Sequence, residues 1–210
     1  MTHYLIEFRF QGRAKSEIKK LVYEVDRKFR LKYVKRKRPV PHATIVAPFY
    51  TKNQKRLVRD FIDICNKHPL IRFNLQGYGC FDSSRVVFIN IKPSKEMIDF
   101  RKDLIKKIKN YSKLVSYDYS KILGIFGRIG EYKPHVTIAM KVEDNKYQKV
   151  KNYIEKKKKL NIRYTLARAT LIKGNRILYE YDFILRKVLN RSQAKNKKIH
   201  TKTIKGLKNN

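Results

Sequence analysis

Hydrophobic positions in the first half of the chain change twice from a spacing of two to a helical spacing. Residues 4–10 alternate apolar with mostly polar side chains, which predicts a strand, and the apolar residues of 18–29 recur at helical spacing. The same patterns predict a strand at 42–47, a helix at 57–65 and a strand that opens at 71–75. The first half therefore reads strand, helix, strand, helix, strand.

The second half repeats this order. Residues 86–91 are apolar on both faces, as in a buried strand, and Pro93 and Ser94 begin the helix that follows. The other predicted elements are a loop at 114–134, a strand from His135, a helix at 147–154, and a hairpin of 162–172 with 177–185 that turns at Gly174 and Asn175.

The two halves also have nearly equal spacing. From His42 to the next strand at Ile71 is 29 residues, and from His135 to Ile162 is 27. This indicates an internal repeat. We expect one domain at 1–186 that contains two βαβ-like lobes, at about 1–84 and 85–186, with an exchange of strands between the lobes left open.

Composition indicates a globular protein. A chain of 210 residues with 42% hydrophobic residues can bury the core of one generous domain. Its apolar runs are short, and its N-terminus lacks a basic segment followed by an apolar one. Cys65 and Cys80 lack the spacing of metal ligands, which favours buried, reduced thiols. We expect a soluble, cytoplasmic monomer with no cofactor and no membrane partner.

Charge adds information about the partner. The chain has 52 lysine and arginine residues against 17 aspartate and glutamate residues, a formal net charge of +35. Codon bias toward lysine is the alternative explanation, but that bias would enrich glutamate as well. The excess favours nucleic acid over a membrane, because no basic helix with a membrane-type apolar face occurs. Its spread along the whole chain predicts salt-sensitive binding.

The end of the chain has a different composition. Residues 187–210 contain eight lysine or arginine residues, no acid and little apolar periodicity. This predicts a basic, disordered tail that lies along phosphates, with a terminus that only improves solubility as the alternative.

One short phrase occurs at equivalent places in the two halves. It reads Pro-His-Ala-Thr-Ile at 41–45 and Pro-His-Val-Thr-Ile at 134–138. On a strand, its histidine and threonine project from the same face, with alpha carbons about 6 to 7 Å apart, so one phosphate can touch both. A histidine on a strand is often only packed and hydrogen-bonded. Duplication of a structural strand, however, gives no reason for a titratable ring in both copies.

Two imidazoles beside one phosphorus atom can carry both protons of an in-line displacement. Because the ordinary pKa of an imidazole is about 6.5, one ring can remove a proton while the other donates one. The threonine hydroxyls can hold the non-bridging oxygens as negative charge builds there. This scheme requires no metal, and carboxylates are rare around the two phrases.

These phrases resemble the motifs of a known superfamily. His42-Ala43-Thr44-Ile45 and His135-Val136-Thr137-Ile138 are similar to the twin His-x-Thr-x motifs of the two-histidine (2H) phosphoesterases, which include the RNA 2′,3′-cyclic phosphodiesterases also called 2′-5′ RNA ligases. The resemblance covers roughly residues 3–186. It implies an α+β fold, a bilobal pseudo-twofold duplication of antiparallel sheets backed by helices, with the motifs facing each other across a groove.

The resemblance also implies roles for single residues. His42 and His135 would be the catalytic acid and base, and Thr44 and Thr137 would bind phosphate. For opening a cyclic phosphate we favour His135 as the group that activates water and His42 as the group that protonates the leaving oxygen. Bacterial ligase-type relatives often have an arginine where this chain has Met140.

Further candidates flank the motifs. Phe49, Tyr50 and Tyr132 can stack on a base, with core packing or plain exposure as the alternative. Arg128 and Lys133 can reach a phosphate.

The function implied by the resemblance is metal-independent phosphodiester chemistry on RNA ends. The substrate would be RNA or a nucleotide with a terminal or cyclic phosphate, and the reaction would be hydrolysis of a 2′,3′-cyclic phosphate to a 2′-phosphate or chemistry at 2′-5′ linkages. Trimming of RNA 3′ ends and a non-catalytic RNA-binding protein are the alternatives.

Overall fold

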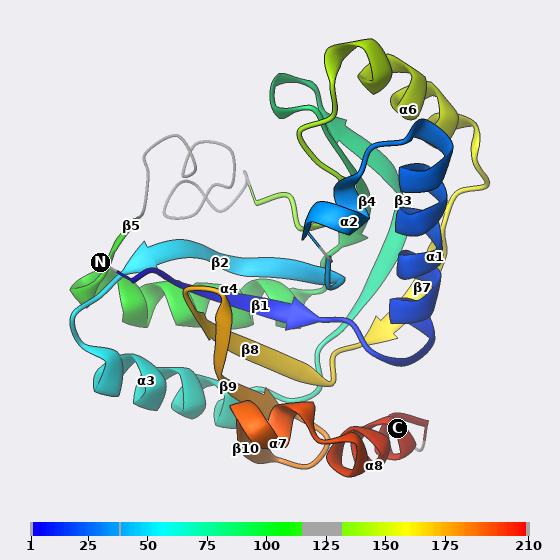
Figure 1. Ribbon diagram of the computed structural model, residues 1–210. Coiled ribbons are helices and arrows are strands. Elements are labelled where there is room, and N and C mark those ends of the chain that lie inside the picture. Colours follow the sequence, from blue (N-terminus) through cyan, green and yellow to red (C-terminus); the bar gives the residue numbers. More distant parts are fainter. Residues whose placement is uncertain (1, 38, 115–131, 209–210) are drawn as a thin grey trace.

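The computed structural model describes residues 2–37, 39–114 and 132–208 (Figure 1). The strands are β1 (Tyr4–Arg9), β2 (His42–Tyr50), β3 (Arg72–Phe81), β4 (Val86–Lys92), β5 (Lys113–Leu114), β6 (His135–Ala139), β7 (Asn161–Thr165), β8 (Arg168–Lys173), β9 (Arg176–Asp182) and β10 (Lys187–Asn190). The helices are α1 (Gly12–Phe29), α2 (Tyr33–Lys37), α3 (Gln54–Lys67), α4 (Lys95–Ile108), α6 (Asp144–Lys156), α7 (Arg191–Lys195) and α8 (Lys197–Lys208).

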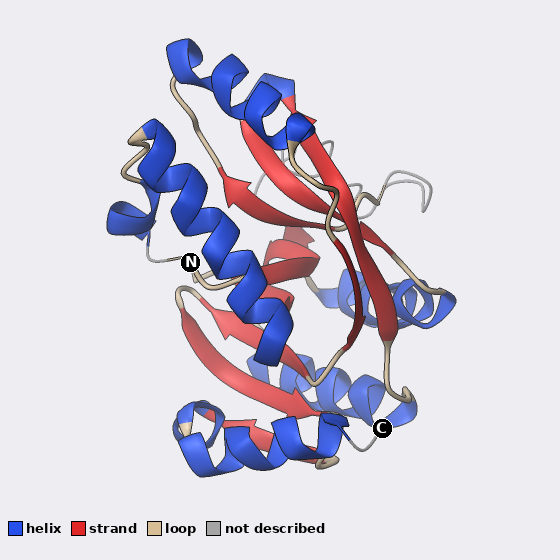
Figure 2. Ribbon diagram, turned by 90° about the vertical axis from the view of Figure 1, so that its right-hand side faces the viewer, coloured by secondary structure: helices blue, strands red, loops and turns tan. Residues whose placement is uncertain are grey.

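The strands form two antiparallel sheets. The first sheet has the order β10-β9-β8-β1-β2-β5, and the second has the order β6-β4-β3-β7. Each sheet takes strands from both halves of the chain, so the boundary near residue 84 does not separate the sheets. Helices surround the strands, and α1 runs beside the second sheet while α3 and α4 cover the first (Figures 1 and 2). The predicted α+β architecture of antiparallel sheets backed by helices is confirmed.

The two sheets share one hydrophobic core. Phe8 of the first sheet stacks on Phe73 of the second, with ring centroids 6.2 Å apart, and also contacts Phe100 of α4 at 5.6 Å.

Of the two cysteines, Cys65 is buried, which raises the pKa of its thiol, whereas Cys80 is only half-buried, unlike the prediction. Among the described residues, no helix has the length and apolar character needed to cross a bilayer.

The predicted hairpin is partly wrong. The segment expected to be one strand at 162–172 is two strands, β7 and β8, because the chain passes from the second sheet to the first at Leu166 and Ala167. The N–H of Leu166 donates to the carbonyl of Ile71, and both residues at the break are fully buried. A continuous apolar run cannot reveal such a change of sheet, since its residues are buried on both sides of the break.

The prediction of a disordered tail is wrong for the described residues up to 208. β10 extends the first sheet beside β9, and Asn190 and Gln193 form a capping box at the start of α7. Leu189 and Thr203 are buried, at 1% and 0% exposure. The apolar residues of α8, Ile199, Ile204 and Leu207, do recur along one side of the helix, but they are few in a strongly basic segment, and the sequence interpretation missed them.

Candidate active site

Both His-x-Thr phrases open a strand, and they are held in the same way. β2 and β6 each begin at the motif histidine. The carbonyl of Pro41 accepts a hydrogen bond from the N–H of Phe10, and the carbonyl of Pro134 accepts one from the N–H of Ile91, both at 3.1 Å. Proline has no N–H to donate, but its carbonyl still pairs with the neighbouring chain. Each histidine therefore starts from a fixed backbone position.

The two imidazole rings have matching hydrogen bonds. Nδ1 of His42 lies 2.8 Å from the carbonyl oxygen of Val40, and Nδ1 of His135 lies 2.9 Å from that of Lys133. A carbonyl can only accept, so each Nδ1 carries the hydrogen. In both rings this leaves Nε2 as the nitrogen that can take up or release a proton.

Alternate residues of β2 and β6 face the core and the site. Ala43 and Ile45 in β2, and Val136 and Ile138 in β6, are buried at 0 to 2% exposure. The histidines and threonines of both motifs are only half-buried. Each motif thus presents its polar residues on the face opposite the core.

Three observations bring the motifs together. His42 and Thr137, from different motifs, line the same cavity. The hydroxyl of Tyr132, three residues before His135, donates to the carbonyl of Thr44 at 3.1 Å. The pKa of His135 is lowered first by burial, and the charge of His42 lowers it further, against the raising effect of the Lys133 carbonyl. The two rings therefore lie within electrostatic reach of each other.

Aromatic residues surround His135. Its ring lies 5.1 Å from the centroid of Phe81, edge to face, and 4.9 Å from that of Phe88. Gly79 makes room for this packing, because a Cβ there would lie 2.6 Å from the ring of Phe88 and 3.0 Å from Oδ1 of Asn90. An apolar surrounding disfavours the charged imidazolium, which agrees with the lowered pKa of His135.

Charged residues surround His42 instead. Oε2 of Glu7 lies 3.9 Å from Nε2 of His42, while Oε1 of the same carboxylate accepts a hydrogen bond from Nε of Arg9 at 2.8 Å. Glu7 is 6% exposed, so little water screens its charge. The first motif therefore has a buried carboxylate beside the Nε2 of its histidine.

The two surroundings occupy equivalent places in the sheets. Glu7 pairs across the strands with Thr44, and Phe88 pairs with Thr137. The same scaffold position thus holds an anion beside one motif and an aromatic ring beside the other. A pair of groups with opposing environments is suited to separate acid and base roles.

Of the base-stacking candidates in β2, Phe49 is wrong, whereas the half-buried Tyr50 stays a prediction. Phe49 is fully buried and its ring lies 6.0 Å from that of Tyr4 in the core, so it cannot meet a base. Tyr50 follows at the far end of β2, paired with Lys113. Eight residues separate it from His42, which is about 26 Å along an extended strand.

The other flanking candidates differ in their placement. Tyr132 makes internal contacts: its hydroxyl donates to the carbonyl of Thr44, and the guanidinium carbon of Arg101 lies 4.1 Å from its ring centroid. Burial raises the pKa of its phenol. Lys133 has an exposed side chain, and it is its carbonyl that orients His135. Arg128 lies outside the described residues.

Sequence reasoning missed Glu7, Arg9, Phe81 and Phe88 as neighbours of the histidines. For Glu7 and Arg9 a signal existed, since they are the polar members of the alternating strand 4–10. Only the strand register shows that they stand opposite the first motif. Within the described part of the chain, no three histidine, cysteine or acidic side chains cluster as a metal-binding group.

Solved structures and a family model show what this chain is similar to. The crystal structure of E. coli LigT in apo form superposes with a TM-score of 0.52 at 16% identity, covering 90% of this chain and 92% of that chain. The structure of Kluyveromyces marxianus Usb1 gives a TM-score of 0.48 at 9% identity, covering 83% and 95%. A search of curated proteins gave no match. A family model described as the 2′-5′ RNA ligase superfamily matches residues 13–177, which include both motifs, and the chain therefore belongs to this superfamily.

Proposed function

We propose that the protein is a phosphodiesterase that opens the 2′,3′-cyclic phosphate at an RNA end to a 2′-phosphate without a metal. His135 removes a proton from water through Nε2, and the resulting oxygen attacks phosphorus. His42 donates its Nε2 proton to the ribose O3′ as the bond from phosphorus to O3′ breaks. Thr44 and Thr137 hold the non-bridging oxygens, where negative charge increases in the transition state.

The observation that carries this proposal is that the two histidine rings are oriented in the same way but have different surroundings. Both rings are oriented by an Nδ1 contact to a carbonyl two residues earlier, so both offer Nε2. A carboxylate stands beside His42, whereas the aromatic surroundings of His135 favour its unprotonated form, which is a proton acceptor. Acid and base catalysis at ordinary pH needs this combination.

The lowered pKa of His135 has a consequence for the pH profile. Because burial disfavours its protonated form, His135 stays unprotonated, and active as a base, to a pH below the ordinary histidine value of about 6.5. We expect the acidic half-maximum of kcat/KM for a 2′,3′-cyclic mononucleotide to lie below that value. Measuring kcat/KM across the range from about pH 4.5 to 9 checks this. An acidic limb at or above pH 6.5 would contradict it.

RNA as the substrate is supported by a row of cations on the sheet face that carries His135. Asn90 pairs with His135, and Lys92, two residues further along β4, projects from the same face. Lys92 pairs with Asn74, which pairs in turn with Arg163 of β7. A groove at this end of the sheet is lined by these residues together with Arg72 and Glu96. Such a row can bind the phosphates of an RNA chain whose end lies at the histidines.

Neutralising this row should separate RNA binding from chemistry. In the variant Arg72→Gln/Lys92→Gln/Arg163→Gln, we expect KM for an RNA oligonucleotide with a cyclic phosphate end to rise. Hydrolysis of a cyclic mononucleotide should be unchanged. The slope of log affinity against log salt should fall by about 2, since each lost contact to a single strand removes about 0.7.

A matched control removes the same charge elsewhere. Lys55→Gln/Lys106→Gln/Lys107→Gln changes three exposed lysines on α3 and α4. If the control variant weakens RNA binding as much as the row variant, the attraction is a property of the net charge, and the row has no special part in it.

Turnover in a chelator tests the proposed function directly. A 2′,3′-cyclic mononucleotide incubated with the wild type and EDTA should give the 2′-phosphate, and both His42→Ala and His135→Ala should abolish this activity. A wild type that binds RNA in a salt-sensitive way but shows no turnover would instead be a non-catalytic RNA-binding protein. Release of single nucleotides from an RNA 3′ end would indicate trimming.

A further inference from the structure

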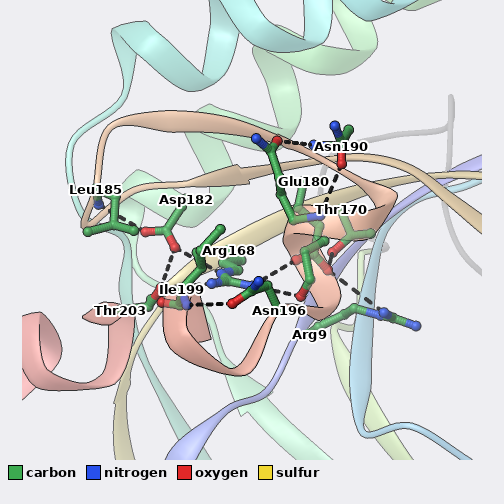
Figure 3. Close-up of polar contacts among 12 residues, drawn as sticks. Arg9, Arg168, Thr170, Glu180, Asp182, Leu185, Asn190, Asn196, Ile199 and Thr203 are labelled. Carbon is green, nitrogen blue, oxygen red and sulfur yellow. Dashed lines mark hydrogen bonds and ion pairs between the residues drawn. The ribbon is translucent and has the colours of Figure 1, made fainter. Parts of the chain in front are cut away.

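A series of polar contacts connects the C-terminal helix to His42, and Figure 3 shows the part of it from Thr203 to Arg9. It begins at Arg168 in β8, a guanidinium that is 1% exposed. Nε of Arg168 contacts Oδ2 of Asp182 at 2.9 Å, and Nη2 donates to Oγ1 of Thr203 in α8 at 2.8 Å. Nη1 reaches the carbonyl of Ala194 in α7 at 3.2 Å. The two C-terminal helices therefore supply direct partners to a buried cation.

Glu180 is the middle residue of this series of contacts. Its Oε2 accepts a hydrogen bond from Nη1 of Arg168 at 3.2 Å, and its Oε1 accepts one from Thr170 at 3.0 Å. The same Oε1 lies 3.7 Å from Nη1 of Arg9. Burial raises the pKa of Glu180, and the two arginines oppose that effect. Glu180 thus joins the cation held by the C-terminal helices to the cation in β1.

Arg9 and Glu7 complete the connection. Nε of Arg9 donates to one oxygen of Glu7 at 2.8 Å, and the other oxygen lies 3.9 Å from Nε2 of His42. Glu7 is therefore shared between Arg9 and the histidine. Lys15 of α1 also faces this end, close enough to Arg9 and Glu180 to feel their charges.

Much of this chain of contacts lies outside the part of the sequence matched by the family model. That model covers residues 13–177, whereas Glu7 and Arg9 precede the match and Glu180, Asp182 and Thr203 follow it. Buried charges keep their positions only when each one is paired, because an unpaired charge in a low-dielectric interior is costly. The position of the Glu7 carboxylate thus depends on partners that extend to α8.

We propose that the C-terminal segment 187–208 is a positioning element of the active site. Through Arg168, Glu180 and Arg9 it holds the Glu7 carboxylate 3.9 Å from Nε2 of His42, the nitrogen that gives its proton to the leaving oxygen. This rests on the proposed function for the role of His42. The placement of a carboxylate beside the ring can, however, be tested without turnover.

The test uses Glu7→Gln and Thr203→Val in the full chain, with two readouts. The first is the pH midpoint of the His42 ring in an NMR titration, assigned by comparison with His42→Ala. The second is the pH dependence of kcat and KM for a 2′,3′-cyclic mononucleotide. The titratable groups around His42 are Lys19, Tyr23 and Tyr33, which line its cavity, and His135. Lys15 and His200 lie further along the series of contacts, beside Arg9 and Glu180 and beside Arg168 and Asp182.

We expect Glu7→Gln to move the His42 midpoint and the basic limb of kcat to lower pH by about one unit, a tenfold loss of kcat above that limb. KM should stay unchanged, because Glu7 does not touch the substrate. Thr203→Val, 0% exposed and nearly isosteric, should act in the same direction with a smaller loss of about threefold. Thr201→Val is the matched control, since Thr201 is an exposed residue of the same helix, and it should behave as the wild type.

Different results would contradict the positioning role of the C-terminal segment and the proposed function. If Glu7→Gln leaves the His42 midpoint unchanged, Glu7 does not hold the proton on that ring. If Thr203→Val lowers the melting temperature but leaves the midpoint as in the wild type, the C-terminal segment only stabilises the fold. Absence of turnover in the wild type, with the midpoint shifted as expected in both variants, would overturn the proposed function alone.

Discussion

His135→Ala is expected to lower kcat for a 2′,3′-cyclic mononucleotide by about 10² to 10⁴, the usual contribution of a positioned general base. His42→Ala should cause a loss of the same order on this substrate, because the ribose O3′ is a poor leaving group that needs a proton. Both losses should appear mainly in kcat, since the threonines supply the phosphate contacts. Steady-state kinetics at a pH between the two limbs of the profile measures them.

The two variants should respond differently to a better leaving group. A thymidine 4-nitrophenyl phosphodiester releases a phenolate that leaves without a proton, and thymidine has no 2′-hydroxyl to compete with water. On this substrate His42→Ala should recover most of the wild-type kcat, whereas His135→Ala should stay as impaired as before.

The opposite pattern would exchange the two roles. If His135→Ala recovered and His42→Ala did not, His42 would be the base, and the carboxylate beside it would have another purpose. Equal losses on both substrates would mean that neither ring protonates the leaving group. The His3→Ala variant is the control, because His3 is half-buried, precedes β1 and belongs to neither motif.

Asp182→Ala is expected to cost about 3 to 5 kcal/mol of the free energy of unfolding. The substitution removes the closer of the two carboxylates that pair with Arg168, at 2.9 Å, in a site where Arg168 and Asp182 are at most 1% exposed. It also removes the oxygen that accepts hydrogen bonds from the N–H groups of Ile184 and Leu185. Urea unfolding followed by circular dichroism measures the loss, since the chain has no tryptophan for fluorescence.

Asp144→Ala is the matched control for this prediction. Asp144 forms an ion pair with Arg85 that is shorter, at 2.6 Å, but its side chain is 86% exposed. Water screens such a pair, so its loss should be a small fraction of that for Asp182. If the two variants were equally destabilised, burial would not be what makes the Arg168 network important. A loss in Asp182→Ala below about 1 kcal/mol would mean that the structure relaxes to pair or hydrate Arg168.

The motif residues could be found from the sequence because their signal is local. A proline, a histidine and a threonine at fixed spacing occur twice, and strand alternation alone places Ala43 and Val136 in the core and the polar residues on the opposite face. The placement of Phe49 could not be found in this way. It lies in the same strand as His42, but the register against β1 puts its ring on Tyr4 in the core.

The tail shows why composition misleads at a docked segment. Residues 187–208 have few apolar positions, and disorder follows from that composition if burial of apolar surface is the only way to fix a helix. Here the hydrogen bonds that Arg168 donates to Thr203 and to the Ala194 carbonyl, together with the pairing of β10 with β9, hold the segment in place. Their partners lie 26 to 35 residues away in the chain, beyond any local pattern.

The amino-acid sequence by itself determined the order of the main strands and helices, the two histidine phrases and the strongly cationic character of the chain. These features depend on spacing and composition, which act over a few residues. Only the tertiary structure decided that the strands of each half are shared between two sheets, that Glu7 stands beside one histidine and Phe88 beside the other, and that the last helix belongs to this arrangement. Those outcomes depend on which distant strands pair and in what register, and a one-residue change of register would turn each of these side chains to the opposite face.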